Sequence, residues 1–94
     1  MAKIYVIDDD DQLLRMVGLM LERGGHTIRL INNPIEGLEQ LKADRPDLLV
    51  LDVMMPGMSG HDVARQIRAN DTLSDMPILV LTARSQDVDR TTAI

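Results

Sequence analysis

The sequence predicts an α/β protein built on a doubly wound parallel sheet. Short apolar runs such as residues 48–51 (LLVL) recur along the 94 residues, as expected of strands that are covered on both faces. Amphipathic segments with helical spacing lie between these runs, which favours βαβ units with right-handed crossovers. The expected order is therefore β-α-β-α-β-α-β-α within one domain.

The first strand is expected over residues 3–8 and the first helix over residues 11–23. The apolar residues of this helix recur at helical spacing: Leu13, Leu14, Val17 and Leu21. Asp10 or Asp11 supplies the N-cap, because a carboxylate accepts hydrogen bonds from the free amides of a first turn. Gly24 is the expected C-terminal stop.

The second strand is expected over residues 27–31, and a second helix follows it to about Ala43. Asn33 and Pro34 mark the start of this helix, since asparagine is a good N-cap and proline fits the first helical position. Its apolar residues are Ile35, Leu38 and Leu41.

The second half of the chain repeats the pattern, with strands over residues 47–51 and 78–81. Between them, Ser59 is expected to cap a helix that ends near Ala69. The inward-facing residues of that helix are Val63, Ala64 and Ile67. Ser85 is expected to cap a last helix after the fourth strand.

Composition excludes several classes of function. The chain has no cysteine, so it has no disulfide framework and no zinc–thiolate site. A net charge of −5 without a dense basic face argues against direct nucleic-acid binding. No apolar stretch is long enough to cross a bilayer, and the N-terminus lacks the pattern of a signal peptide. We therefore expect a soluble cytoplasmic protein that does not bind membranes.

Three carboxylates are expected to meet at one edge of the sheet. Asp8 and Asp9 follow the first apolar run, and Asp52 follows the third. Neighbouring parallel strands end about 5 Å apart at the same edge, where ligands of open α/β sheets bind. An all-oxygen donor set suits Mg²⁺, with Mn²⁺ as the alternative, and the cation offsets the repulsion between carboxylates. The competing interpretation is that these aspartates only begin a helix and end a strand.

Other residues near this edge are candidates for supporting roles. An aspartate beside a divalent cation is placed to accept a phosphoryl group, and Thr82, which ends the fourth apolar run, could donate a hydroxyl to it. Met54 could lend its backbone carbonyl to the metal. Residues 56–57 (Pro-Gly) and Gly60 are typical of turns, and Gly57 is the glycine expected to let the backbone approach the site.

Three motifs together closely resemble the receiver domains of bacterial two-component response regulators. They are residues 3–10 (KIYVIDDD), residues 48–60 (LLVLDVMMPGMSG) and residues 77–84 (PILVLTAR). The resemblance covers the whole chain with matching spacing, and the middle motif is highly specific. It implies a flavodoxin-like fold with five strands in the order 2-1-3-4-5.

The resemblance also implies a role in a phosphorelay. Asp52 would be the phosphoacceptor, taking the phosphoryl group from a sensor histidine kinase. Asp8 and Asp9 would bind Mg²⁺ together with Asp52 and the Met54 carbonyl. The protein would be a phosphoprotein that switches an output domain, and not an enzyme beyond weak self-catalysed phosphotransfer and dephosphorylation.

Further roles follow from the second and third motifs. Thr82 would be the switch hydroxyl that turns toward the phosphoryl group, and the Ala83 amide would assist it. Met54 and Arg84 occupy the positions that tune self-dephosphorylation in this family. Their identities look like those of regulators that carry DNA-binding output domains.

The chain departs from the family pattern at its C-terminal end. Residues 1–94 are expected to form a receiver domain that lacks the fifth strand, the last helix and the family's lysine, since the two lysines are Lys3 and Lys42. An uncovered fourth strand should pair with other chains, so we expect homo-oligomers through that edge. The missing lysine supports an alternative, a receiver-like interaction or dimerisation module without effective phosphotransfer. A phosphohydrolase of the haloacid-dehalogenase type is disfavoured, because Met54 stands where that chemistry needs a proton donor.

Overall fold

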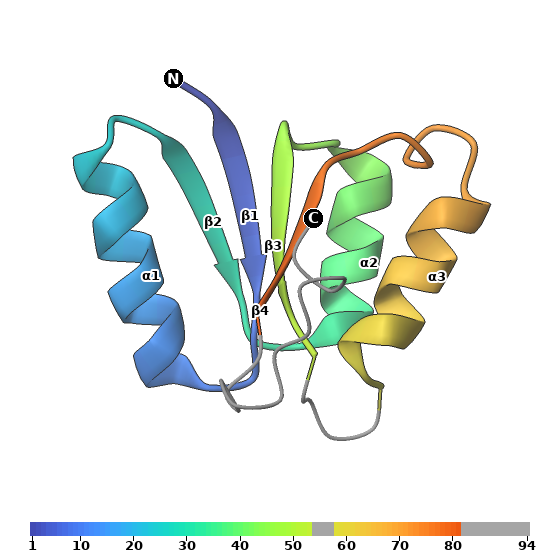
Figure 1. The fold of residues 1–94 in the computed structure, drawn as a ribbon, viewed down its shortest axis with the longest axis horizontal. Coiled ribbons are helices and arrows are strands. Elements are labelled where there is room, and N and C mark those ends of the chain that lie inside the picture. The colour runs from blue at the N-terminus through green and yellow to red at the C-terminus, as the bar shows by residue number, and fades with distance from the viewer. Residues whose placement is uncertain (54–57, 82–94) are drawn as a thin grey trace.

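The computed structural model describes residues 1–53 and 58–81, which form a parallel sheet with a helical layer on each face (Figure 1). The strands are β1 (Lys3–Ile7), β2 (Thr27–Ile31), β3 (Leu48–Asp52) and β4 (Ile78–Leu81). The helices are α1 (Asp11–Arg23), α2 (Pro34–Ala43) and α3 (Gly60–Ala69). The four strands are parallel in the order β2-β1-β3-β4, so the predicted fold class and strand order are confirmed.

The predicted boundaries hold to within about one residue at the site. β1 ends at Ile7 and not at Asp8, while β3 includes Asp52 as its last residue. The predicted last helix lies in residues 82–94, outside the described residues. In the part of the chain that the structure describes, no helix is long and apolar enough to cross a membrane.

Alternating side chains of the strands separate the interior into two apolar clusters. On the face covered by α2 and α3, Tyr5 and Ile7 of β1 pack with Leu49 and Leu51 of β3. On the α1 face, Ile4, Val6 and Val50 pack around Leu14. This period of two is the geometry of a strand, and it explains why the apolar runs are continuous.

Helix α2 turns two of its three apolar residues toward the interior. Leu38 and Leu41 are buried, but Ile35 is 63% exposed. The residue that faces the sheet near the start of α2 is Gly37, whose missing side chain leaves room for Ile7. Residues two positions apart point to nearly opposite sides of a helix, so Ile35 points to solvent when Gly37 faces the sheet.

Side-chain caps begin all three helices of the described chain. The carboxylate of Asp10 accepts from the amides of Gln12 and Leu13, which decides between the two predicted caps. Ser59 and Asp62 form a reciprocal capping box at α3 that the sequence analysis missed. After α1, the backbone reverses at Gly25, which has a φ of 89°.

Charged side chains pair with one another at the amino ends of the strands. The ammonium of Lys3 lies 2.5 Å from one carboxylate oxygen of Asp44, and the Tyr5 hydroxyl donates to the other at 3.0 Å. The guanidinium of Arg29 lies 5.4 Å from the centre of the Tyr5 ring. We call Lys3, Tyr5, Arg29 and Asp44 the amino-end cluster.

Strand β4 is an edge of the sheet within the described residues, and its Leu79 is 37% exposed. The expectation that chains pair along this edge stays a prediction.

Candidate metal and phosphoryl site

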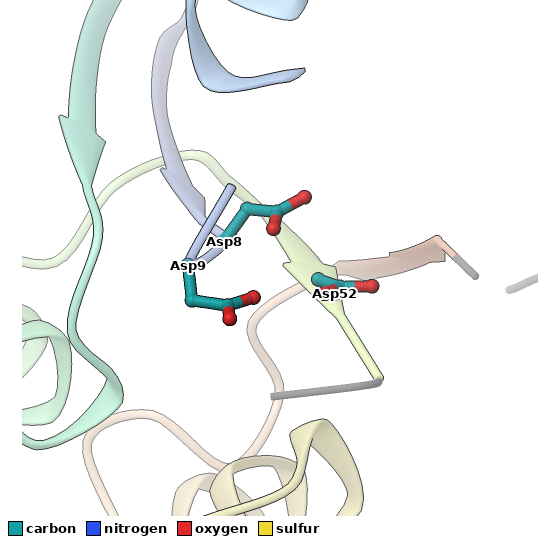
Figure 2. Close-up of side chains that lie close together, drawn as sticks. All are labelled: Asp8, Asp9 and Asp52. Atoms are coloured by element: carbon teal, nitrogen blue, oxygen red, sulfur yellow. The ribbon is translucent and has the colours of Figure 1, made fainter. Parts of the chain in front are cut away.

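The carboxyl ends of β1 and β3 bring three aspartates together. Strand pairing places Ile7, the last residue of β1, beside Leu51 of β3. Asp8 follows Ile7 and Asp52 follows Leu51, so the two aspartates lie next to each other at the carboxyl ends of these strands. Asp9 follows in the turn to α1. Figure 2 shows the three side chains side by side at this edge of the sheet. The juxtaposition that the sequence predicts for Asp8, Asp9 and Asp52 is therefore present.

The geometry of this triad fits a single small cation. One oxygen from each carboxylate lies within 4.8 Å of the other two. Asp8 is 2% exposed and Asp52 is 6% exposed, whereas Asp9 is exposed. The carboxylates of Asp8 and Asp52 are thus buried, and that of Asp9 is exposed to solvent. An ion could therefore reach the triad from the side of Asp9.

Local hydrogen bonds orient Asp8. Its backbone amide donates to the carbonyl of Ile31 on β2 at 3.1 Å, and one carboxylate oxygen accepts from the amide of Asp10 at 2.9 Å. Asp10 itself turns to cap α1. Of the acidic run at residues 8–11, Asp8 and Asp9 therefore lie in the triad, and Asp10 caps α1.

The electrostatics of the site favour a bound cation. Burial, and to a smaller extent the neighbouring carboxylates of Asp52 and Asp9, together raise the pKa of Asp8 from 3.8 to about 6, against the opposing hydrogen bond from the Asp10 amide. Like charges are thus held close together at a cost in free energy. A divalent cation would remove this cost, and hard oxygen ligands of this kind are those that Mg²⁺ prefers. The residues present fit Mg²⁺.

The backbone after Asp52 is held from two sides. The amide of Val53 donates to the carbonyl of Leu81 on β4 at 3.0 Å. The carbonyl of Val53 accepts from the amide of Gly60, at the start of α3, at 2.9 Å. Gly60 is the first residue of α3 and not part of a turn, so its predicted role was wrong. The close approach that we assigned to Gly57 is seen at Gly60, and Gly57 lies outside the described residues.

The remaining predicted site residues lie outside the described residues. These are Met54, Thr82, Ala83 and Arg84. The register between β3 and β4 pairs Asp52 with Leu81, the residue before Thr82 in the sequence. Their predicted roles stay predictions.

Comparison with known proteins identifies close relatives of the chain. A family model described as the response regulator receiver domain matches residues 4–94. The transcriptional regulatory protein AfsQ1 of Streptomyces coelicolor is 44% identical over 89 residues, which is 95% of this chain and 38% of that protein. Response regulator MprA of Mycobacterium ulcerans is 45% identical over 89 residues, with the same coverage. The chain spans 38% of the length of these curated relatives.

Solved structures share the fold. The N-terminal domain of a response regulator receiver protein from Methanoculleus marisnigri is 37% identical, with a TM-score of 0.85 over 89% of this chain and 68% of that one. The chemotaxis protein CheY4 of Vibrio cholerae is 27% identical, with a TM-score of 0.81 over 92% of this chain and 74% of that one.

Proposed function

Because this chain belongs to the response regulator receiver family, we propose that Asp52 is the residue on which it accepts a phosphoryl group. The donor would be a phosphohistidine of a sensor histidine kinase, and Mg²⁺ would be required. The phosphorylated domain would then control an output domain. In this proposal the protein is a phosphoacceptor rather than a turnover enzyme.

One observation carries the proposal, the convergence of Asp8, Asp9 and Asp52 at the carboxyl ends of two neighbouring strands. Burying the two carboxylates of Asp8 and Asp52 lowers the stability of the fold, and buried charged groups of this kind are typical of functional sites. Asp52 would be the attacking residue, because it is the last residue of β3 and its carboxylate lies beside those of Asp8 and Asp9.

The transfer would exchange one bond for another. An oxygen of the Asp52 carboxylate attacks phosphorus, and the bond from phosphorus to the imidazole nitrogen of the donor breaks. The electron pair of that bond leaves with the nitrogen, which takes a proton from water. Asp8, held by the Asp10 amide, and Asp9 would hold Mg²⁺, which offsets negative charge on the phosphoryl oxygens when it is bound.

Incubation with acetyl phosphate tests this proposal without the need to know the kinase. We expect the intact mass to increase by one phosphoryl group when Mg²⁺ is present and not when it is chelated. The added phosphoryl group should be lost in acid or hydroxylamine, as expected of an acyl phosphate. Peptide mapping should place it on Asp52.

Asp52→Asn is the matched variant, because the amide keeps the size of the side chain but is a poor nucleophile. We expect it to take up no phosphate. Labelling of Asp52→Asn at the wild-type level would contradict the assignment of Asp52. A wild-type chain that binds Mg²⁺ but takes up no phosphate would instead favour the interaction module.

A further inference from the structure

Helix α3 begins directly against the backbone of the proposed phosphoacceptor. A Cβ atom at Gly60 would lie 2.8 Å from the Cα of Val53 and 2.9 Å from the carbonyl carbon of Asp52, and closer still to the Asp52 carbonyl oxygen. Real Cβ atoms essentially never approach other atoms this closely, so neighbouring atoms would have to move. Any side chain at position 60 therefore has to push α3 and the Asp52–Val53 peptide apart.

The atoms in the way are backbone atoms, which distinguishes Gly60 from the other buried helical glycines. A Cβ at Gly37 would meet the Cδ1 of Ile7 at 2.5 Å, and a Cβ at Gly18 would meet the Cδ1 of Ile28 at 3.0 Å. Those atoms are the ends of flexible side chains and can rotate away. At Gly60 the strain can be relieved only by displacing main chain.

Hydrogen bonds would direct this displacement to the site. The Val53 amide is bonded to the carbonyl of Leu81, and the Val53 carbonyl is bonded to the amide of Gly60. The peptide after Asp52 is thus tied both to β4 and to α3. If α3 moves away, the Asp52 end of β3 moves or loses one of these bonds, and its carboxylate changes position relative to Asp8.

We propose that Gly60 is a positioning residue that sets where the Asp52 carboxylate stands relative to Asp8 and Asp9. Through that position it sets the affinity for Mg²⁺ and the rate at which Asp52 accepts a phosphoryl group. Gly60 touches neither the ion nor the phosphoryl group. This inference rests on the proposed function of Asp52.

Calorimetric titration with Mg²⁺ tests the proposal on Gly60→Ala, with Gly18→Ala as the matched control. Both variants add one methyl group at a buried helical glycine, but Gly18 packs on β2, away from Asp52. We expect Gly60→Ala to bind Mg²⁺ about 10- to 100-fold more weakly, the range seen when a partner that orients a ligand is lost. Its phosphorylation by acetyl phosphate should slow by roughly 100-fold. Gly18→Ala should match the wild type in both.

A stabilising osmolyte separates positioning from simple loss of stability. Sucrose raises the stability of the folded state without altering its contacts, so it would restore a variant that is only partly unfolded. We expect sucrose to raise the melting temperature of Gly60→Ala and to leave its weak Mg²⁺ binding unchanged. Recovery of wild-type affinity in sucrose would overturn the proposal.

A second variant keeps the test decisive if Gly60→Ala does not fold. Ser59→Ala removes the cap that fixes the first turn of α3 and adds no atom near Asp52. We expect it to fold and to bind Mg²⁺ more weakly than Gly18→Ala does. Wild-type Mg²⁺ affinity in the folded variants at positions 59 and 60 would overturn the proposal. Failure of the wild-type chain to take up phosphate would instead contradict the proposed function.

Discussion

The two ends of the parallel sheet arrange their charges in opposite ways. At the amino end, the carboxylate of Asp44 lies between the Lys3 ammonium and the Tyr5 hydroxyl. At the carboxyl end, Asp8 lies beside two other carboxylates, those of Asp52 and Asp9, and both raise its pKa. Strand β1 contributes to both ends, with Lys3 and Tyr5 at the amino end and Asp8 directly after its carboxyl end.

The pKa values move in opposite directions for this reason. The hydrogen bond from Lys3 lowers the pKa of Asp44, helped by the one from Tyr5. Burial and like charge raise the pKa of Asp8 to about 6. The amino end therefore stabilises the fold by itself, while the carboxyl end gains stability only when protons or a cation arrive. We therefore expect the carboxyl end of the sheet to bind a divalent cation strongly.

The largest expected effect comes from Asp8→Asn. The asparagine oxygen can still accept the hydrogen bond from the Asp10 amide, but the buried negative charge is gone. We expect the metal-free variant to be more stable than the wild type at pH 7 by about 1–2 kcal/mol. Its Mg²⁺ affinity should fall by more than about 100-fold, beyond the effect of losing only an outer partner of a ligand.

Urea unfolding in EDTA and calorimetric titration with Mg²⁺ measure these two quantities. Asp44→Asn is the control at the opposite end of the sheet, and its Mg²⁺ affinity should equal that of the wild type. A metal-free Asp8→Asn variant that is less stable than the wild type would show that the carboxylates do not repel one another.

The pH dependence of the metal-free protein should also differ between the two ends. The pKa of Asp8 is about 6 in the folded state against 3.8 ordinarily, so between these values the folded state holds the extra proton. Its contribution to the free energy of unfolding therefore falls as the pH rises from about 4 to about 6, by about 1–2 kcal/mol. Urea midpoints measured across this window should fall in the wild type and stay level in Asp8→Asn.

The lowered pKa of Asp44 has the opposite sign. Its contribution is present above the ordinary value of 3.8 and is lost as the pH falls below it through the folded pKa. The hydrogen bond from Arg45 lowers the pKa of Asp75, so the contribution of Asp75 to stability depends on pH in the same way. A single rise of stability with pH across the whole range from 3 to 7 would contradict this account of Asp8.

Tyr5→Phe removes one contact of the amino-end cluster. The ring stays buried, but the hydroxyl that donates to Asp44 is lost, so the free energy of unfolding should fall by about 1 kcal/mol. Mg²⁺ binding should not change, because the cluster lies at the end of the sheet opposite to the triad. Weaker Mg²⁺ binding in this variant would show that the two ends are coupled.

The smallest expected effect belongs to the ion pair itself. Lys3 and Asp44 are both half-exposed, so water and salt screen their attraction. We expect Lys3→Met to lower the melting temperature slightly at low ionic strength. The difference from the wild type should disappear at high salt, and a difference that persists there would indicate lost packing instead.

The sequence predicted most of the sheet and of the triad because both depend on local pattern. Each apolar run had to be a strand, and parallel strands bring the residues that follow them to one edge, so Asp8 and Asp52 could be placed without coordinates. The cap at Asn33 followed from its neighbour Pro34 in the same way. These signals lie within a few residues of one another.

Contacts that depend on how the helices pack against distant segments could not be predicted. Tyr5 and Asp44 meet only because α2 ends beside β1, and nothing near either residue indicates it. Glycine is common in turns, so the sequence predicts a turn at Gly60. Its actual constraint is the approach of α3 to Asp52, which belongs to the packing of the fold. The capping box of Ser59 and Asp62 does have a local sequence signal, a serine followed three residues later by an acid.

We propose that the carboxyl end of the sheet is a cation site whose carboxylates repel one another until a cation binds. Urea unfolding of the wild-type chain at pH 7, in Mg²⁺ and in EDTA, tests it most directly. We predict a higher free energy of unfolding in Mg²⁺, increasing with the logarithm of its concentration, and no such increase in Asp8→Asn. Equal stability of the wild type in Mg²⁺ and EDTA would contradict the account.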